Sequence, residues 1–152
     1  MLVCVPASPL ATTLVRRGQR LARRFQGSFW TVYVRVPGIR LKPEEEAHLQ
    51  ASFELSRDLG GKVLDVDGES ASREILRLAD EHRATHIIVG LSRRSRLKGL
   101  VGKSLVDELL RCSHDVDVLV IADHDRGQTE ADRPRSGNHL KPNGDDPIGS
   151  KS

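Results

Sequence analysis

The sequence predicts an α/β domain with a single doubly wound, five-stranded parallel sheet of strand order 3-2-1-4-5. Two observations predict it. Short β-branched or aromatic runs alternate along the chain with longer amphipathic patterns, and three of these runs are apolar nearly throughout. Strict alternation of strands and helices favours a parallel sheet with right-handed crossovers and helices on both faces.

The strand pattern occurs in five segments: 1–5, 28–36, 62–66, 85–90 and 117–122. The first, fourth and fifth are apolar nearly throughout, as strands covered on both faces are. His86 falls inside the fourth segment, where we expect a histidine of the core rather than a catalytic base.

The segments between the strands have helical spacing. Residues 9–25 place arginines on one face and four large apolar side chains on the other: Leu10, Leu14, Leu21 and Phe25. Pro43 and the three glutamates after it predict the start of a helix over 44–59. Ser70 is the predicted cap of a helix over 71–83, and Ser104 begins a last helix over 104–112.

The 152 residues suffice for one domain, which we expect over 1–123. Residues 124–152 are rich in Gly, Pro, Asp, Asn and Ser and predict a disordered tail. Cys4 and Cys112 sit in apolar runs, which indicates buried, reduced thiols and a cytoplasmic protein. No apolar stretch reaches the length of a transmembrane helix, so we expect no membrane insertion.

The net charge of +3 does not by itself imply a nucleic-acid partner, but the basic residues are clustered. One cluster is the arginine face of the first helix, which we interpret as solvated: Arg16, Arg17, Arg20, Arg23 and Arg24. The other follows the fourth strand: Arg93, Arg94, Arg96, Lys98 and Lys103. No aromatic residue is interleaved with the basic residues for base stacking, so nucleic acid is not the expected partner.

Gly102-Lys103-Ser104 resembles the end of the phosphate-binding loop G-x-x-x-x-G-K-[ST]. Leu97 stands where the first glycine belongs, and the loop from the preceding strand is too long. A P-loop enzyme is therefore a third hypothesis. The sequence shows no other catalytic pattern: the histidines lack metal-ligand spacing, and Asp65 and Asp67 are expected to be solvated loop acids. We expect no enzyme and no metal site.

The segments 89–111 and 115–122 resemble the end of a universal stress protein domain, an adenine nucleotide alpha hydrolase-like fold. The nucleotide motif of that family is Gly-x2-Gly-x9-Gly-[Ser/Thr], and Gly90 and Ser104 match it. Arg93 and Lys103 stand at the other two glycine positions. The family's Val-Asp-x-Ser after the first strand is Val-Pro-Ala-Ser here, so only Ser8 is kept. The resemblance implies an ATP site between these two loops, with arginine side chains in place of the glycine turn.

The arginine-rich loop resembles one branch in particular, the universal-stress-like domain of the potassium sensor histidine kinase KdpD. The residues that carry this match are Gly90, Ser92, Arg93, Arg94, Ser95, Arg96, Ser104, Leu105, Val106 and Asp107. The resemblance implies a non-catalytic signalling module whose loop binds an anionic ligand or the acidic face of a protein partner, such as a sensor kinase. Guanidinium groups beside free N–H groups of a helix start suit phosphate.

Some members of this branch bind a cyclic dinucleotide through Ser-x-Ser and, twenty residues on, Phe-Thr-Ala-x-Tyr. In that register Ser8, Phe29 and Tyr33 match, so cyclic di-AMP is an alternative ligand to ATP. Phe29 and Tyr33 also fit the alternation of a buried strand. Family members commonly dimerise through the last strand, here the apolar edge 116–121, so a homodimer is a further expectation.

Overall fold

The computed structural model describes residues 1–91 and 102–122. For residues 102–104 it describes the backbone only. Strands and helices alternate along these residues. In chain order they are β1 (Leu2–Cys4), α1 (Leu10–Arg24), β2 (Trp30–Arg35), α2 (Pro43–Asp58), β3 (Lys62–Asp67), α3 (Ala71–Glu81), β4 (His86–Leu91), α5 (Gly102–Cys112) and β5 (Asp117–Ala122). Each predicted strand and helix is present, with ends that differ by a few residues.

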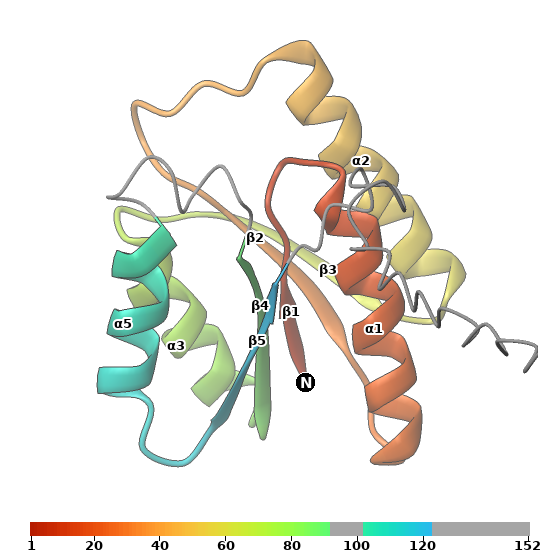
Figure 1. Cartoon of the computed structure of the whole chain (residues 1–152), viewed down its shortest axis with the longest axis vertical. Coiled ribbons are helices and arrows are strands. Elements are labelled where there is room, and N and C mark those ends of the chain that lie inside the picture. Colours follow the sequence, from red (N-terminus) through yellow and green to blue (C-terminus); the bar gives the residue numbers. More distant parts are fainter. Residues whose placement is uncertain (92–101, 123–152) are drawn as a thin grey trace, which may run out of the picture.

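The strands form one five-stranded parallel sheet in the order β3-β2-β1-β4-β5, which confirms the predicted topology (Figure 1). β1 lies in the middle, where Leu2 is opposite Trp30 of β2 and Ile87 of β4. The carboxyl ends of β1 and β4 therefore lie side by side, at the upper edge of the sheet in Figure 1.

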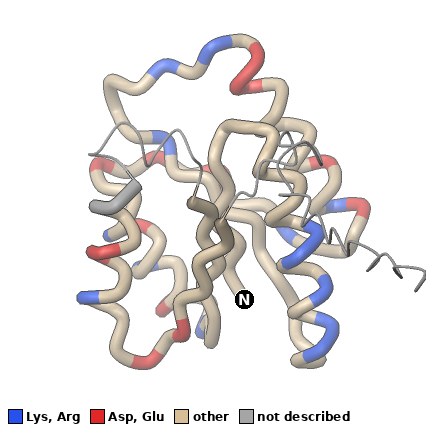
Figure 2. The backbone as a smooth tube through the Cα atoms, viewed as in Figure 1, with Lys and Arg blue, Asp and Glu red and all other residues tan. Residues whose placement is uncertain are grey.

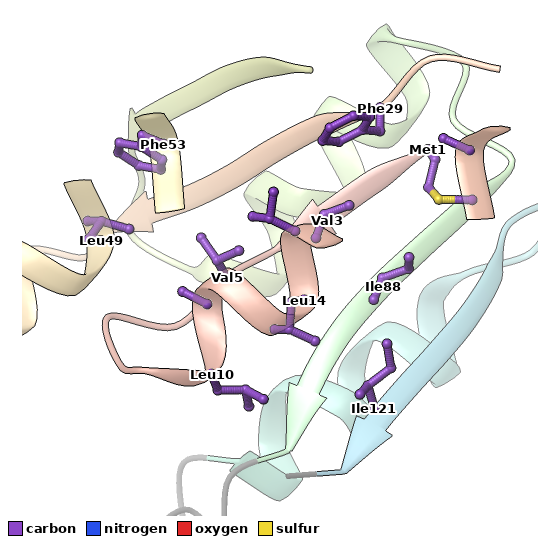
Figure 3. Close-up of a cluster of buried hydrophobic side chains, with 13 residues drawn as sticks. Met1, Val3, Val5, Leu10, Leu14, Phe29, Leu49, Phe53, Ile88 and Ile121 are labelled. Carbon is purple, nitrogen blue, oxygen red and sulfur yellow. The ribbon is translucent and has the colours of Figure 1, made fainter. Parts of the chain in front are cut away.

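Helices α1 and α2 cover one face of the sheet, and α3 and α5 cover the other (Figure 1). β1 supplies side chains to both layers. Val3 belongs to one buried cluster with Leu14 and Leu49, which Figure 3 shows, and Leu2 belongs to the other with Ile75. Burial on both faces explains why this strand is apolar throughout.

Two glycines let α1 lie close to the sheet. A Cβ at Gly18 would overlap a methyl group of Val3. A Cβ at Gly90 would lie 2.7 Å from Leu14 Cδ1 and 2.8 Å from Leu10 Cδ2, closer than carbon atoms pack. The short distance of α1 from β1 and β4 thus depends on the absence of a side chain at both positions.

The capping residues that the sequence predicts at the starts of α2 and α3 are confirmed. Glu45 accepts a hydrogen bond from the Lys42 N–H at 2.8 Å, and Pro43 is the first residue of α2. At α3, Ser70 Oγ accepts from the Arg73 N–H at 3.5 Å. The helix therefore begins after the predicted serine cap.

The predictions that Phe25 and Cys112 are buried are wrong. Phe25 is 58% exposed because α1 ends at Arg24 and the chain turns away through Gln26, whose φ is 53°. Cys112 is exposed because it is the last residue of α5, beyond the buried Leu109. Cys4 is buried, as expected, and burial raises the pKa of its thiol to about 12.

Candidate functional site

At the carboxyl ends of the neighbouring strands β1 and β4, the connections of the chain diverge to opposite faces of the sheet. After β1 the chain crosses to α1 on one face of the sheet, and after β4 it crosses to α5 on the other. In open α/β sheets, ligands bind in the crevice that such a reversal leaves beyond the strand ends. The structure thus brings the loop 6–9 next to Leu91, the residue at which the second loop singled out by the sequence, 91–103, begins.

A hollow of about 170 Å³ lies at this edge, on the α3 and α5 side of the sheet. Its described lining is mostly apolar and includes Pro6 after β1, Val89 and Gly90 of β4, Ile75 of α3 and Leu105 of α5. None of the described lining residues carries a charge. A ligand here would therefore place an uncharged group in the hollow and any charged group outside it.

Ser8 lies in the loop between β1 and α1. Its Oγ is buried and has no hydrogen-bond partner among the residues that the structure describes. The next residue, Pro9, caps α1 without a side-chain hydrogen bond, and the first turn of α1 has no acidic residue. Buried polar atoms are nearly always paired, so Ser8 Oγ is a candidate to hydrogen-bond a ligand or another residue at this edge.

Gly90 lines the hollow, but its missing side chain has a packing role. The space that a Cβ would occupy is filled by Leu10 and Leu14 on the α1 side of the sheet. The first glycine of the nucleotide motif is therefore required by helix packing, whatever the ligand.

Phe29 and Tyr33, the two aromatic residues that match the cyclic-dinucleotide motif, lie at different places in the structure. Tyr33 lines the hollow, and burial raises the pKa of its phenol although the Arg35 guanidinium, 5.6 Å from the ring centre, lowers it. Phe29 precedes the first residue of β2, so it lies at the amino end of the sheet. It is 4% exposed and belongs to the core cluster of α1 and α2. The described backbone does not bring Phe29 to the hollow.

The remaining predicted site residues lie wholly or partly outside the described structure: Ser92, Arg93, Arg94, Ser95 and Arg96 in full, and the side chains of Lys103 and Ser104. The backbone of Lys103 and Ser104 belongs to the first turn of α5, which begins at Gly102. Residues 92–101 separate that turn from the end of β4, whereas a P-loop runs directly from its strand into its helix.

Sequence reasoning missed a cluster of charges next to the hollow. Arg35 at the end of β2 donates to both oxygens of Glu46 at 3.0 and 3.2 Å and to both oxygens of Asp65 at 2.8 and 2.9 Å. Asp65 is thus an ion-paired residue of β3 and not a solvated loop acid. The only sequence signal for this pairing is the opposite charge of the residues, because their contact depends on the register of β2 with β3.

His86 is half-buried rather than fully in the core. Its Nδ1 lies 2.8 Å from Thr85 Oγ1, its Nε2 lies 3.6 Å from an Asp117 oxygen, and its ring stacks on Phe25 with centres 4.6 Å apart. These contacts give it a structural role at the amino end of β4. Among residues 1–91 and 102–122, no group of His, Cys, Asp and Glu could hold a metal ion.

The profile of the universal stress protein family matches residues 1–122. The chain belongs to the universal stress protein family. Within the part of the chain that is described, no helix is both long and apolar enough to cross a bilayer.

Relatives by sequence include KdpD sensor proteins. The chain is 30% identical over 122 residues to a KdpD-type sensor protein of Synechocystis and 29% identical over 124 residues to sensor protein KdpD of Escherichia coli. The matches cover 80% of this chain, but only 33% of the Synechocystis protein and 14% of the Escherichia coli protein. The chain thus corresponds to the universal stress domain of these longer proteins.

Solved structures of the family share the fold. A universal stress protein in complex with cAMP has a TM-score of 0.56 and 20% identity, covering 80% of this chain and 94% of that one. A universal stress protein from Archaeoglobus fulgidus in complex with dAMP also has a TM-score of 0.56 and 20% identity, covering 79% of this chain and 94% of that one. At this identity the comparison establishes the fold alone.

Proposed function

We propose that the chain is a non-catalytic regulatory module of the KdpD-like branch that binds an anionic ligand or the acidic face of a signalling partner. The binding residues are those of the arginine-rich loop, Ser92, Arg93, Arg94, Ser95 and Arg96, with Lys103 and Ser104 at the start of α5 and Ser8 across the edge. A longer sensor kinase or another signalling component is the expected partner.

The observation that carries the proposal is the position of the hollow at the reversal between β1 and β4. The arginine-rich loop leaves this edge at Leu91 and returns to it at Gly102, and Ser8 lies in the neighbouring loop. A phosphate at this edge would meet guanidinium groups and the N-terminus of α5, a combination that favours anions.

A nucleotide is the best supported class of small ligand. The hollow of about 170 Å³ is smaller than the roughly 300 Å³ at which pockets for whole ligands begin, so it would hold one part, such as a base. Two solved relatives hold cAMP and dAMP. For this chain ATP and cyclic di-AMP are the alternative ligands. Its site differs from the family's nucleotide motif because Arg93 and Lys103 stand where that motif has glycines.

Thermal unfolding in the presence of ATP, ADP, AMP, cyclic di-AMP or pyrophosphate tests the proposal. A ligand at a hundred times its Kd adds about 2.7 kcal/mol to the free energy of unfolding. We expect the stabilisation to be lost in the variant Arg93→Ala/Arg94→Ala/Arg96→Ala. It should be kept in a matched control, Arg57→Ala/Arg73→Ala/Arg111→Ala, which removes the same number of exposed arginines from α2, α3 and the last turn of α5.

Three outcomes would change the assignment. Stabilisation by ATP that survives the loop variant and disappears in Ser104→Ala would favour an ordinary nucleotide-binding stress protein. Steady ATP hydrolysis that is lost in Lys103→Ala would favour the P-loop enzyme. If none of these ligands stabilises the chain, binding to the isolated kinase core of a KdpD relative tests the acidic protein partner, and no binding there would contradict the proposal.

The last strand favours a homodimer as a second element of the proposal. β5 is an edge of the sheet, and Val120 on it is 42% exposed. Edge strands with apolar side chains pair readily with another copy. Sedimentation equilibrium of the wild type and of Val120→Lys tests it, and a monomer in both would exclude the dimer.

A further inference from the structure

A groove of about 730 Å³ lies between α1 and β5, on the opposite face of the sheet from the hollow. One wall is formed by four arginines of α1, Arg17, Arg20, Arg23 and Arg24. The floor is apolar and consists of Leu21 of α1 with Leu119 and Ile121 of β5. Figure 2 shows the basic residues following one another along α1. We refer to this surface as the α1–β5 groove.

Within residues 1–91 and 102–122, the arginines of the groove have few partners. The helix α1 contains no Asp or Glu, so no acid stands at the spacing where helical ion pairs form. In the described structure, the contact that these side chains make within the chain is from Arg20 Nε to the Arg16 carbonyl at 3.4 Å. Arg77 on α3 shows the alternative, because it pairs with both Glu74 and Glu81 of its own helix.

A solvated basic helix face does not need an apolar floor. Leu21 and Leu119 are only half-buried although both pack against the core cluster. Leu119 lies on β5, which is an edge strand of the sheet. Apolar side chains bordered by arginines are typical of protein interfaces, where arginine is enriched and a small apolar centre supplies the binding energy.

We propose that the α1–β5 groove docks an acidic segment of a partner protein that also carries aliphatic side chains. Four guanidinium groups on one wall select carboxylates, and the floor formed by Leu21, Leu119 and Ile121 accepts aliphatic groups. This docking site uses residues other than the arginine-rich loop, so it does not depend on the proposed anion site. Leu119 and Ile121 lie on β5, the strand of the proposed homodimer, and the variant Val120→Lys tests that dimer separately.

The described surface favours this occupant over three others. Single-stranded nucleic acid is bound largely through aromatic side chains on which bases stack, and none of the described lining residues is aromatic. A membrane would need the apolar face of α1, but Leu10 and Leu14 on that face are buried under the helix. A second copy that placed its own α1–β5 groove on this one would bring arginines against arginines.

Binding of a fluorescent Glu- and Leu-rich amphipathic peptide to the full chain tests the proposal by anisotropy. We expect saturable binding that weakens with salt and falls about tenfold in Arg17→Glu/Arg20→Glu, which corresponds to about 1.4 kcal/mol. The control Arg57→Glu/Arg73→Glu makes the same change of charge on exposed helix positions of α2 and α3 and should bind like the wild type. Leu119→Ser should weaken binding at unchanged net charge, with its melting temperature measured to show that it folds.

Several results would overturn the inference. The groove has no role if the peptide does not bind, if both double variants weaken binding equally, or if Leu119→Ser folds and binds normally. A peptide with Gln in place of Glu that binds equally well would remove the role of the arginines. Tighter binding of a single-stranded RNA or of phosphatidylserine vesicles, lost in Arg17→Glu/Arg20→Glu, would assign the surface to that partner. A change in sedimentation with the same variant would assign it to a second copy.

Discussion

Replacing Gly90 by alanine separates a packing role of this glycine from a role in ligand approach. The added Cβ would lie 2.7 Å from Leu14 Cδ1 and 2.8 Å from Leu10 Cδ2, and both leucines are buried. Overpacking of this kind costs about 1–3 kcal/mol, and the loss of glycine's extra freedom in the unfolded chain returns about 0.5–1 kcal/mol. We therefore expect a net loss of about 1–2 kcal/mol in the free energy of unfolding.

Thermal and urea unfolding without ligand measure this loss, which corresponds to a fall in melting temperature on the order of 5 °C. Gly27→Ala is the matched control. A Cβ there would find only the Phe25 carbonyl oxygen, at 3.9 Å, so the change should stay within about 1 kcal/mol. If Gly90 is limited by packing, Gly90→Ala/Leu10→Ala should cost less than the sum of the single changes. A Gly90→Ala variant that unfolds like the wild type and differs only in ligand binding would refute the reasoning.

Two further predictions concern the ion pairs of Arg35 and the two thiols. Arg35→Gln should destabilise the chain by about 1 kcal/mol at neutral pH, since the paired side chains are partly exposed. Hydrogen bonds from Arg35 lower the pKa of Glu46, so this stabilisation is present above the carboxyl's unfolded pKa and is lost as the pH falls through the lower folded value. Unfolding curves of both forms should therefore converge in acid, and a difference that grows in acid would contradict the pairing. With a thiol reagent, exposed Cys112 should react at once and buried Cys4 only after denaturation. Rapid reaction of both thiols in the native chain would contradict the burial of Cys4.

The fold was predictable because its signals are local. Runs such as 85–90 and 117–122 are apolar on both faces, and the helical spacing between the strands leaves few ways to connect them other than by right-handed crossovers. The helix ends were harder. Phe25 has the spacing of a buried residue, but the helix stops at Arg24, and the pattern does not record where the helix stops.

The position of the hollow was predictable from the sequence, whereas the contacts around it were not. The sequence places the loops after β1 and β4 at one edge, and the structure finds the hollow there. The contact of Arg35 with Glu46 and Asp65 could not be predicted, because it joins residues of three elements whose relative positions depend on the whole fold. The same holds for Phe29, whose match to a ligand motif ignores which end of the strand it occupies.

The close approach of α1 to the sheet through Gly18 and Gly90 also affects recognition. A helix held at backbone distance from two strands cannot roll about its axis without forcing Leu10 and Leu14 into the sheet. The Cα–Cβ bonds of its outward arginines consequently keep one direction before and after any encounter. An incoming chain would meet a preorganised set of charges, and the entropy lost on association would fall mainly on that chain and on the tips of the arginine side chains.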